Sequence, residues 1–213
     1  MSNTFALYQA NCSGLAVEYD GEKFKALSGL YRRFNNVNLL RAKITPENVL
    51  DILRCCSTPE NFTFLNMDID SYDYFVLREV LTGYRPSLIC AEVNEKIPPP
   101  IRFSVKYDPS HVWASDHFYG QSLAQLALLC EDFRYDLVEL HYNNAFLVPR
   151  EINSHAALAV QDAYDQGYRL KPDRRKLFPW NADMDLLLSM TTPDALRFLN
   201  EKFKKYEGRY VIE

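Results

Sequence analysis

The chain has 213 residues, 47% of them hydrophobic and 14% aromatic, which suffices for one large domain with a buried core but not for two comfortable ones. Its formal net charge of −4 offers no basic surface for a phosphate backbone and argues against non-specific nucleic-acid binding. With no apolar run near the roughly 20 residues of a membrane span, no signal region and no CxxC pair among its five cysteines, we expect a cytoplasmic protein without a membrane partner.

Short apolar runs alternate with helix-length amphipathic segments, which is typical of βα units in a mostly parallel sheet. Two late strands flank Asn143-Asn144, a turn pair that favours an antiparallel hairpin. The expected strands are 15–18, 37–44, 62–67, 87–93, 101–107, 135–141 and 145–148, and the expected helices are 3–11, 23–34, 45–56, 72–81 and 120–133.

Beyond Arg150 the pattern changes to helices alone, expected at 154–165, 183–190 and 193–206. We therefore predict an α/β domain over residues 1–150, with a Rossmann-like, mostly parallel sheet and a C-terminal antiparallel hairpin. A helical C-terminal extension over residues 151–213 follows it. The sequence leaves open whether this extension covers a site or forms a surface for a homo-oligomer.

Polar side chains close several of the predicted strands. In an open α/β sheet, ligands gather beyond the carboxyl ends of the strands. Helix caps and turns explain some of these residues equally well, but Glu92 lies within an apolar run, where a structural role is hard to assign. The strand-end residues are Glu18, Asp68, Asp70, Glu92, Asn94, His141, Asn143 and Asn144.

The polar residues of the sequence suggest candidates for three roles: ribose binding, metal binding and general base. A carboxylate between a strand and a helix is the usual partner of ribose hydroxyls, and Glu18 fits that role with Asp20 as the alternative. An all-oxygen group suits Mg²⁺ or another hard cation. For a general base the candidates are histidines or an aspartate, although a loop histidine is more often a surface residue. The metal candidates are Asp68, Asp70, Glu92 and Asn94, and the base candidates are His111, His117, His141 and Asp68.

Several motifs resemble those of FkbM-type S-adenosylmethionine (SAM) methyltransferases, a class I methyltransferase family. Residues 64–74 (FLNMDIDSYDY) resemble its DIDG-x-DY segment, and residues 84–94 (YRPSLICAEVN) its YRP…EYN strand. Residues 119–123 (YGQSL) are similar to YGASL, 144–148 (NAFLV) to NAFFV, and 2–4 with 14–18 to SNT…GLxVE. The resemblance spans residues 2–150 in the family's order.

This resemblance implies a SAM-dependent methyltransferase, acting on a hydroxyl of a small acceptor such as a sugar or a secondary metabolite. It adds Asn3 and Asp68 to Glu18 and Asp20 as cofactor-binding candidates. Of the base candidates, Asp68, His117 and His141 form the predicted catalytic set. A nucleotide-sugar or dinucleotide enzyme is disfavoured, because the chain contains neither GxGxxG nor a Walker sequence.

The chain departs from the family at its start. In relatives, an E-x-G…G strand and loop precede the SNT helix and wrap the methionine end of SAM, whereas here SNT follows Met1 directly. The fold is therefore expected to be N-terminally truncated. Three explanations stay open: a start placed too late in the reading frame, a non-catalytic relative that has lost SAM binding, or replacement of the strand by residues 209–212.

Overall fold

The structure is a computed structural model and describes residues 4–213. The chain divides into two compact units, Met1–Glu60 and Asn61–Glu213, and each is described by itself. This division differs from the expected boundary near Arg150, because the C-terminal extension packs within the same unit as the second unit's sheets. Together the units form a mixed α/β fold with parallel and antiparallel strand pairs.

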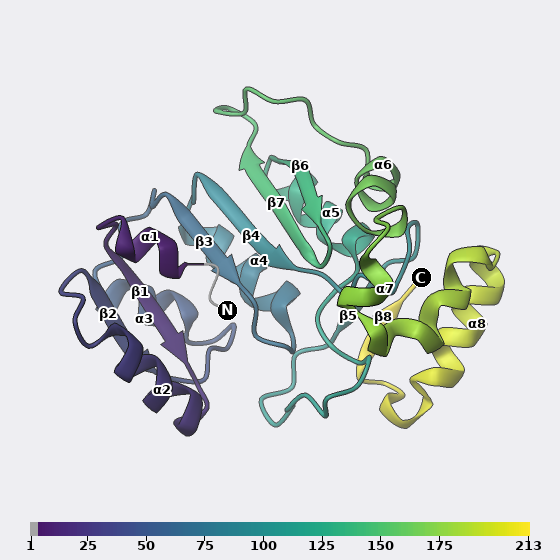
Figure 1. The fold of residues 1–213 in the computed structure, drawn as a ribbon, viewed down its shortest axis with the longest axis horizontal. Helices are drawn as coiled ribbons and strands as arrows, with labels where there is room; N and C mark the ends of the chain where they lie inside the picture. Colours follow the sequence, from purple (N-terminus) through teal and green to yellow (C-terminus); the bar gives the residue numbers. More distant parts are fainter. Residues whose placement is uncertain (1–3) are drawn as a thin grey trace. The chain divides into compact units, whose positions relative to one another are not determined.

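The first unit carries a two-stranded parallel sheet in which Gly14 pairs with Val37 and Glu18 with Arg41. Its helix α2 begins after Asp20, whose carboxylate accepts a hydrogen bond from the Lys23 backbone N–H and so caps the helix. The elements of this unit are α1 (Phe5–Gln9), β1 (Gly14–Glu18), α2 (Gly21–Tyr31), β2 (Val37–Arg41) and α3 (Val49–Cys55) (Figure 1).

The second unit contains a four-stranded sheet in the order β3-β4-β7-β6. Strands β3 and β4 are parallel, whereas β7 runs antiparallel to both of its neighbours. The predicted hairpin is thus confirmed, but the expectation of a mostly parallel sheet is met only in part. The elements are β3 (Phe64–Met67), α4 (Asp73–Gly83), β4 (Leu88–Glu92), β5 (Phe103–Val105), α5 (Leu123–Asp132), β6 (Tyr135–His141) and β7 (Asn144–Pro149).

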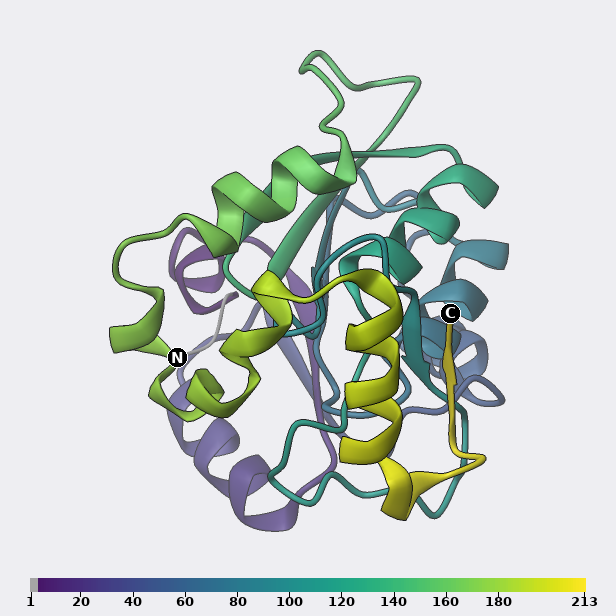
Figure 2. The same cartoon turned by 90° about the vertical axis from the view of Figure 1, so that its right-hand side faces the viewer.

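The C-terminal extension is irregular over residues 151–159, mostly helical from Val160, and ends in a strand. Strand β8 (Tyr210–Ile212) pairs antiparallel with β5, and backbone hydrogen bonds join Arg102 and Glu213 in both directions (Figures 1 and 2). The expectation that no strand follows Arg150 is therefore wrong, and residues 209–212 do not take the place of a central strand. Before β8 lie α6 (Val160–Tyr164), the π-helical turn η1 (Asp165–Arg169), α7 (Arg174–Leu177), the 3₁₀ segments η2 (Pro179–Ser189) and η3 (Lys204–Tyr206), and α8 (Thr192–Lys202).

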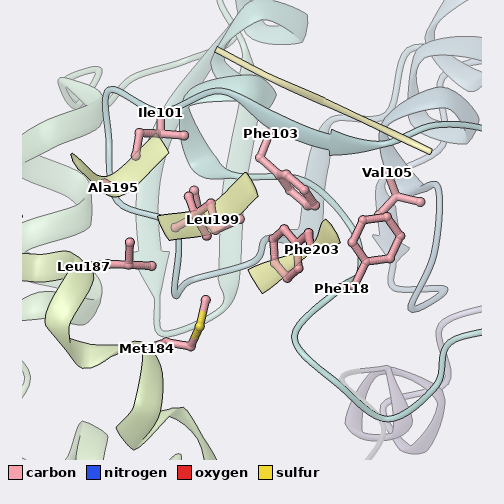
Figure 3. Close-up of a cluster of buried hydrophobic side chains, with 10 residues drawn as sticks. Ile101, Phe103, Val105, Phe118, Met184, Leu187, Ala195, Leu199 and Phe203 are labelled. Atoms are coloured by element: carbon pink, nitrogen blue, oxygen red, sulfur yellow. The ribbon is translucent and has the colours of Figure 1, made fainter. Parts of the chain in front are cut away.

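Apolar side chains fasten this extension to the rest of the second unit. Figure 3 shows Met184, Leu187 and Leu199 of the extension facing Phe103 and Phe118, and all of them are buried. Burial of such side chains removes large apolar areas from water and is the main favourable term in packing. In the described part of the chain, no helix is long and apolar enough to cross a bilayer.

Candidate functional site

The loop between β3 and α4 is shaped by a buried carboxylate. Asp73, at the start of α4, accepts hydrogen bonds from the backbone N–H groups of Ile69 (2.9 Å) and Ser71 (3.0 Å). Burial raises the pKa of Asp73 to about 6, although these two amides oppose the shift. Asp70 adopts a left-handed backbone conformation with φ 55°, which aspartate tolerates better than most residues. This tight loop sets Asp68 and Asp70 beside the end of β4.

Asp68, Asp70 and Glu92 form a group that we call the carboxylate cluster. One carboxylate oxygen from each lies within 4.8 Å of the other two. Glu92 is the buried member, at 8% exposure, and its Oε1 accepts a hydrogen bond from Asn143 Nδ2 at 2.9 Å. Its other oxygen, Oε2, is buried without a hydrogen-bond partner. The sequence-predicted acids at the ends of β3 and β4 therefore do converge.

The environment of Glu92 strongly disfavours its ionised form. Burial, followed by the charges of Asp68, Asp73 and Asp70, raises the pKa of Glu92 to about 10. A buried, ionised carboxylate that lies beside other carboxylates costs free energy unless a proton or a cation neutralises it. The cluster therefore favours the binding of a proton or a cation.

The donor set of the cluster fits a hard divalent cation. Metal–oxygen distances of about 2.1 Å for Mg²⁺ and about 2.5 Å for Ca²⁺ place ligand oxygens on opposite sides of the ion about 4 to 5 Å apart. The three carboxylate oxygens, all within 4.8 Å of one another, are therefore close enough to contact one ion. The unpartnered Oε2 of Glu92 is the acceptor that a cation would engage.

Asn94, the fourth predicted metal ligand, has a structural task. It is fully buried, and its Nδ2 donates to the backbone carbonyls of His117 (2.9 Å) and Tyr119 (3.0 Å). Its Oδ1 is buried without a hydrogen-bond partner. The side chain therefore ties the 117–119 segment to the end of β4, and its role as a ligand stays a prediction.

The predicted histidines differ in their surroundings. His117 Nε2 lies 3.0 Å from Asp183 Oδ1, a residue of η2, and Asp183 also pairs with Lys202. Burial lowers the pKa of His117 and outweighs the opposing charge of Asp183, which favours the neutral imidazole. His141 is exposed. It lies opposite Asn144 in the β6–β7 strand pair, and Asn144 lies opposite Glu92 in the β4–β7 strand pair. His141 is thus two strands from Glu92, about 10 Å at the usual strand spacing.

The predicted cofactor residues belong mostly to the first unit. Glu18 closes β1, and its Oε1 accepts a hydrogen bond from the Asp20 backbone N–H at 2.8 Å. Asp20 caps α2, so one of its carboxylate oxygens is already occupied. Asn3 lies outside the described residues. Binding of a ribose by Glu18 or Asp20 stays a prediction.

Several residues near the cluster were not predicted. Asn143 was named among the strand-end residues without a role, and the structure shows that it donates a hydrogen bond to Glu92. Asp73 was part of the quoted DIDSYD motif, whereas Asp183 carried no local signal. Glu95 and Lys96 are almost completely buried just after β4, and two charges so close to an apolar strand were a sign of a buried polar network.

Comparisons with known proteins do not name a family. No protein-family model matches the chain. A search of curated proteins likewise finds no matching relative.

Proposed function

We propose that this chain is a SAM-dependent methyltransferase that methylates a hydroxyl group of a small acceptor, such as a sugar or a secondary metabolite. The proposal includes a Rossmann-like arrangement of the kind found in FkbM-type enzymes. The observation that carries it is the carboxylate cluster at the carboxyl ends of β3 and β4, with its unpartnered Glu92 oxygen. The motif resemblance over residues 2–150 supplies the class of reaction.

Each candidate residue has its own proposed role. Glu18, or Asp20 in its place, binds the ribose hydroxyls of SAM, and bound SAM supplies the electrophilic methyl group. Asp68, Asp70 and Glu92 would hold a hard cation such as Mg²⁺, and such an ion would lower the pKa of an acceptor hydroxyl. Orientation of that hydroxyl for in-line displacement provides much of the rate.

A base must also receive the proton of the acceptor. Among Asp68, His117 and His141, we favour His117, because burial lowers its pKa and so favours the neutral imidazole, which is the form that accepts a proton. Its contact with Asp183 restrains the ring, as an orienting carboxylate does in other histidine bases. The role of His117 is part of the proposal.

The first test measures SAM and Mn²⁺ binding by calorimetry, and methyl transfer to a panel of monosaccharides and catechols with and without EDTA. We expect SAM binding, metal-dependent transfer, and at least a tenfold loss of Mn²⁺ affinity in Asp68→Asn, because the substitution removes one anionic ligand. Asp132→Asn is the matched control, since Asp132 is exposed on α5, outside the cluster.

The outcomes separate the competing functions. Full methylation activity in EDTA would exclude a role for the metal but would leave the proposed methyltransferase activity in place. Binding of Mn²⁺ without any binding of SAM would contradict the proposal and favour a non-catalytic relative that has lost SAM binding. Equal Mn²⁺ affinity in Asp68→Asn and the wild-type protein would remove the carboxylate cluster as the metal site.

A further inference from the structure

The segment that follows β4 carries two ionisable side chains into the interior. Glu95 and Lys96 are only 2% and 4% exposed. Lys96 Nζ lies 3.5 Å from Glu95 Oε1 and 2.7 Å from the hydroxyl of Tyr119, which donates to Glu95 Oε2 at 2.9 Å. These three side chains form a closed polar triangle just beyond the end of the strand that bears Glu92.

The C-terminal extension completes this triangle from outside the sheet. Asn181 Nδ2 donates to Glu95 Oε1 at 2.6 Å and also contacts the hydroxyl of Tyr168 at 3.1 Å. The hydroxyl of Tyr164 donates to the backbone carbonyl of Glu95 at 2.8 Å. All three extension side chains are buried, so the extension holds both the side chain and the backbone of Glu95.

Simple attachment of the extension does not require such a network. Apolar contacts such as Leu199 against Phe103 already bury the extension without desolvating a charge (Figure 3). A buried ion pair often contributes less stability than apolar residues of the same size, but its directional hydrogen bonds specify one geometry. The geometry specified here is that of residues 93–96, which backbone bonds from Val93 to Asn143 and from Asn94 to Gln121 also restrain.

We propose that Glu95 is a positioning residue through which the C-terminal extension holds the end of β4, so that Glu92 lies close to Asp68 and Asp70 in the carboxylate cluster. This inference rests on the proposed role of the cluster as a cation site. It assigns the extension a task in ligand binding through Tyr164, Tyr168 and Asn181. Mutation of the groups that hold metal ligands in place commonly lowers metal affinity by about 10- to 100-fold.

The test compares two identical substitutions at opposite ends of β4. Tyr164→Phe removes the hydrogen bond to the Glu95 carbonyl, whereas Tyr135→Phe removes an equal bond of 2.8 Å to the Pro86 carbonyl before the strand begins. Both tyrosines are 1% exposed. We expect similar falls in the urea unfolding midpoint, but an increase of about tenfold in the Mn²⁺ dissociation constant for Tyr164→Phe alone.

A second measurement keeps the inference testable without a metal. Amide hydrogen exchange of a peptide spanning residues 92–97 should accelerate in Tyr164→Phe and not in Tyr135→Phe. Equal Mn²⁺ affinities in the two variants would overturn the inference. If the wild-type protein binds no Mn²⁺, the proposed cation site fails, and selective acceleration of exchange then supports the holding role of the extension while equal exchange overturns it.

Discussion

Replacing Glu92 by glutamine should stabilise the metal-free protein at neutral and alkaline pH. The folded-state pKa of Glu92 is raised from 4.5 to about 10, so the folded protein keeps a proton that the unfolded chain releases. Stability is therefore lost as the pH rises above about 4.5, and the loss continues towards pH 10. At 1.36 kcal/mol for each pH unit, the cost at pH 7 reaches about 3 kcal/mol, and we expect a gain of about 1 to 3 kcal/mol.

Urea unfolding in EDTA between pH 4.5 and 8.5 measures this effect. Glutamine retains an acceptor for Asn143 Nδ2 and cannot ionise, so the advantage of the variant should vanish near pH 4.5 and grow with pH. Glu139→Gln, on the exposed side of β6, is the control and should show no such trend. A constant stability difference across the pH range would contradict the prediction.

The same substitution should act on metal binding with the opposite sign. Glu92→Gln removes the anionic ligand whose Oε2 has no partner, and we expect Mn²⁺ affinity to fall at least tenfold. A residue that destabilises the empty protein but serves its ligand is typical of a functional site. Stabilisation together with unchanged Mn²⁺ affinity would show that Glu92 is only a strained core residue.

Local reasoning predicted the edge of the sheet well. Asp68, Asp70 and Glu92 follow apolar runs, and parallel strands end at the same edge, so their convergence in the second unit follows from the sequence pattern. The Asn143-Asn144 pair likewise indicated the hairpin, because two asparagines between two apolar runs are typical of a tight turn.

The long-range contacts around the site could not be predicted from local sequence patterns. Asp183 is 66 residues from His117, and Asn181 is 86 residues from Glu95, so no spacing rule connects them. The segment that carries both is an irregular 3₁₀ stretch, which has no strong hydrophobic period. Strand β8 was missed for a related reason, since its three residues gain their strand conformation only by pairing with β5.

Replacing Gly167 by alanine should destabilise the second unit more than any surface change. A Cβ atom at this position of η1 would lie 2.2 Å from the backbone oxygen of Leu140 and 2.6 Å from its Cβ. The Gly167 carbonyl accepts a hydrogen bond from the Tyr142 backbone N–H at 2.9 Å, so η1 cannot withdraw from the end of β6 without losing this bond. Overpacking typically costs about 1 to 3 kcal/mol, and we expect a cost of about 3 kcal/mol here because the clash is with backbone that cannot move aside.

Thermal unfolding followed by tryptophan fluorescence measures this loss, because both tryptophans, Trp113 and Trp180, lie in the second unit. For a chain of this size, we expect a fall of roughly 6 to 12 °C in the midpoint. Gly29→Ala is the control: its added methyl group meets no atom within 4 Å, so the tryptophan transition should not fall. An unchanged midpoint in Gly167→Ala would show that η1 can move away from β6. The extension would then be too loosely held to keep Tyr164 and Tyr168 in place around Glu95.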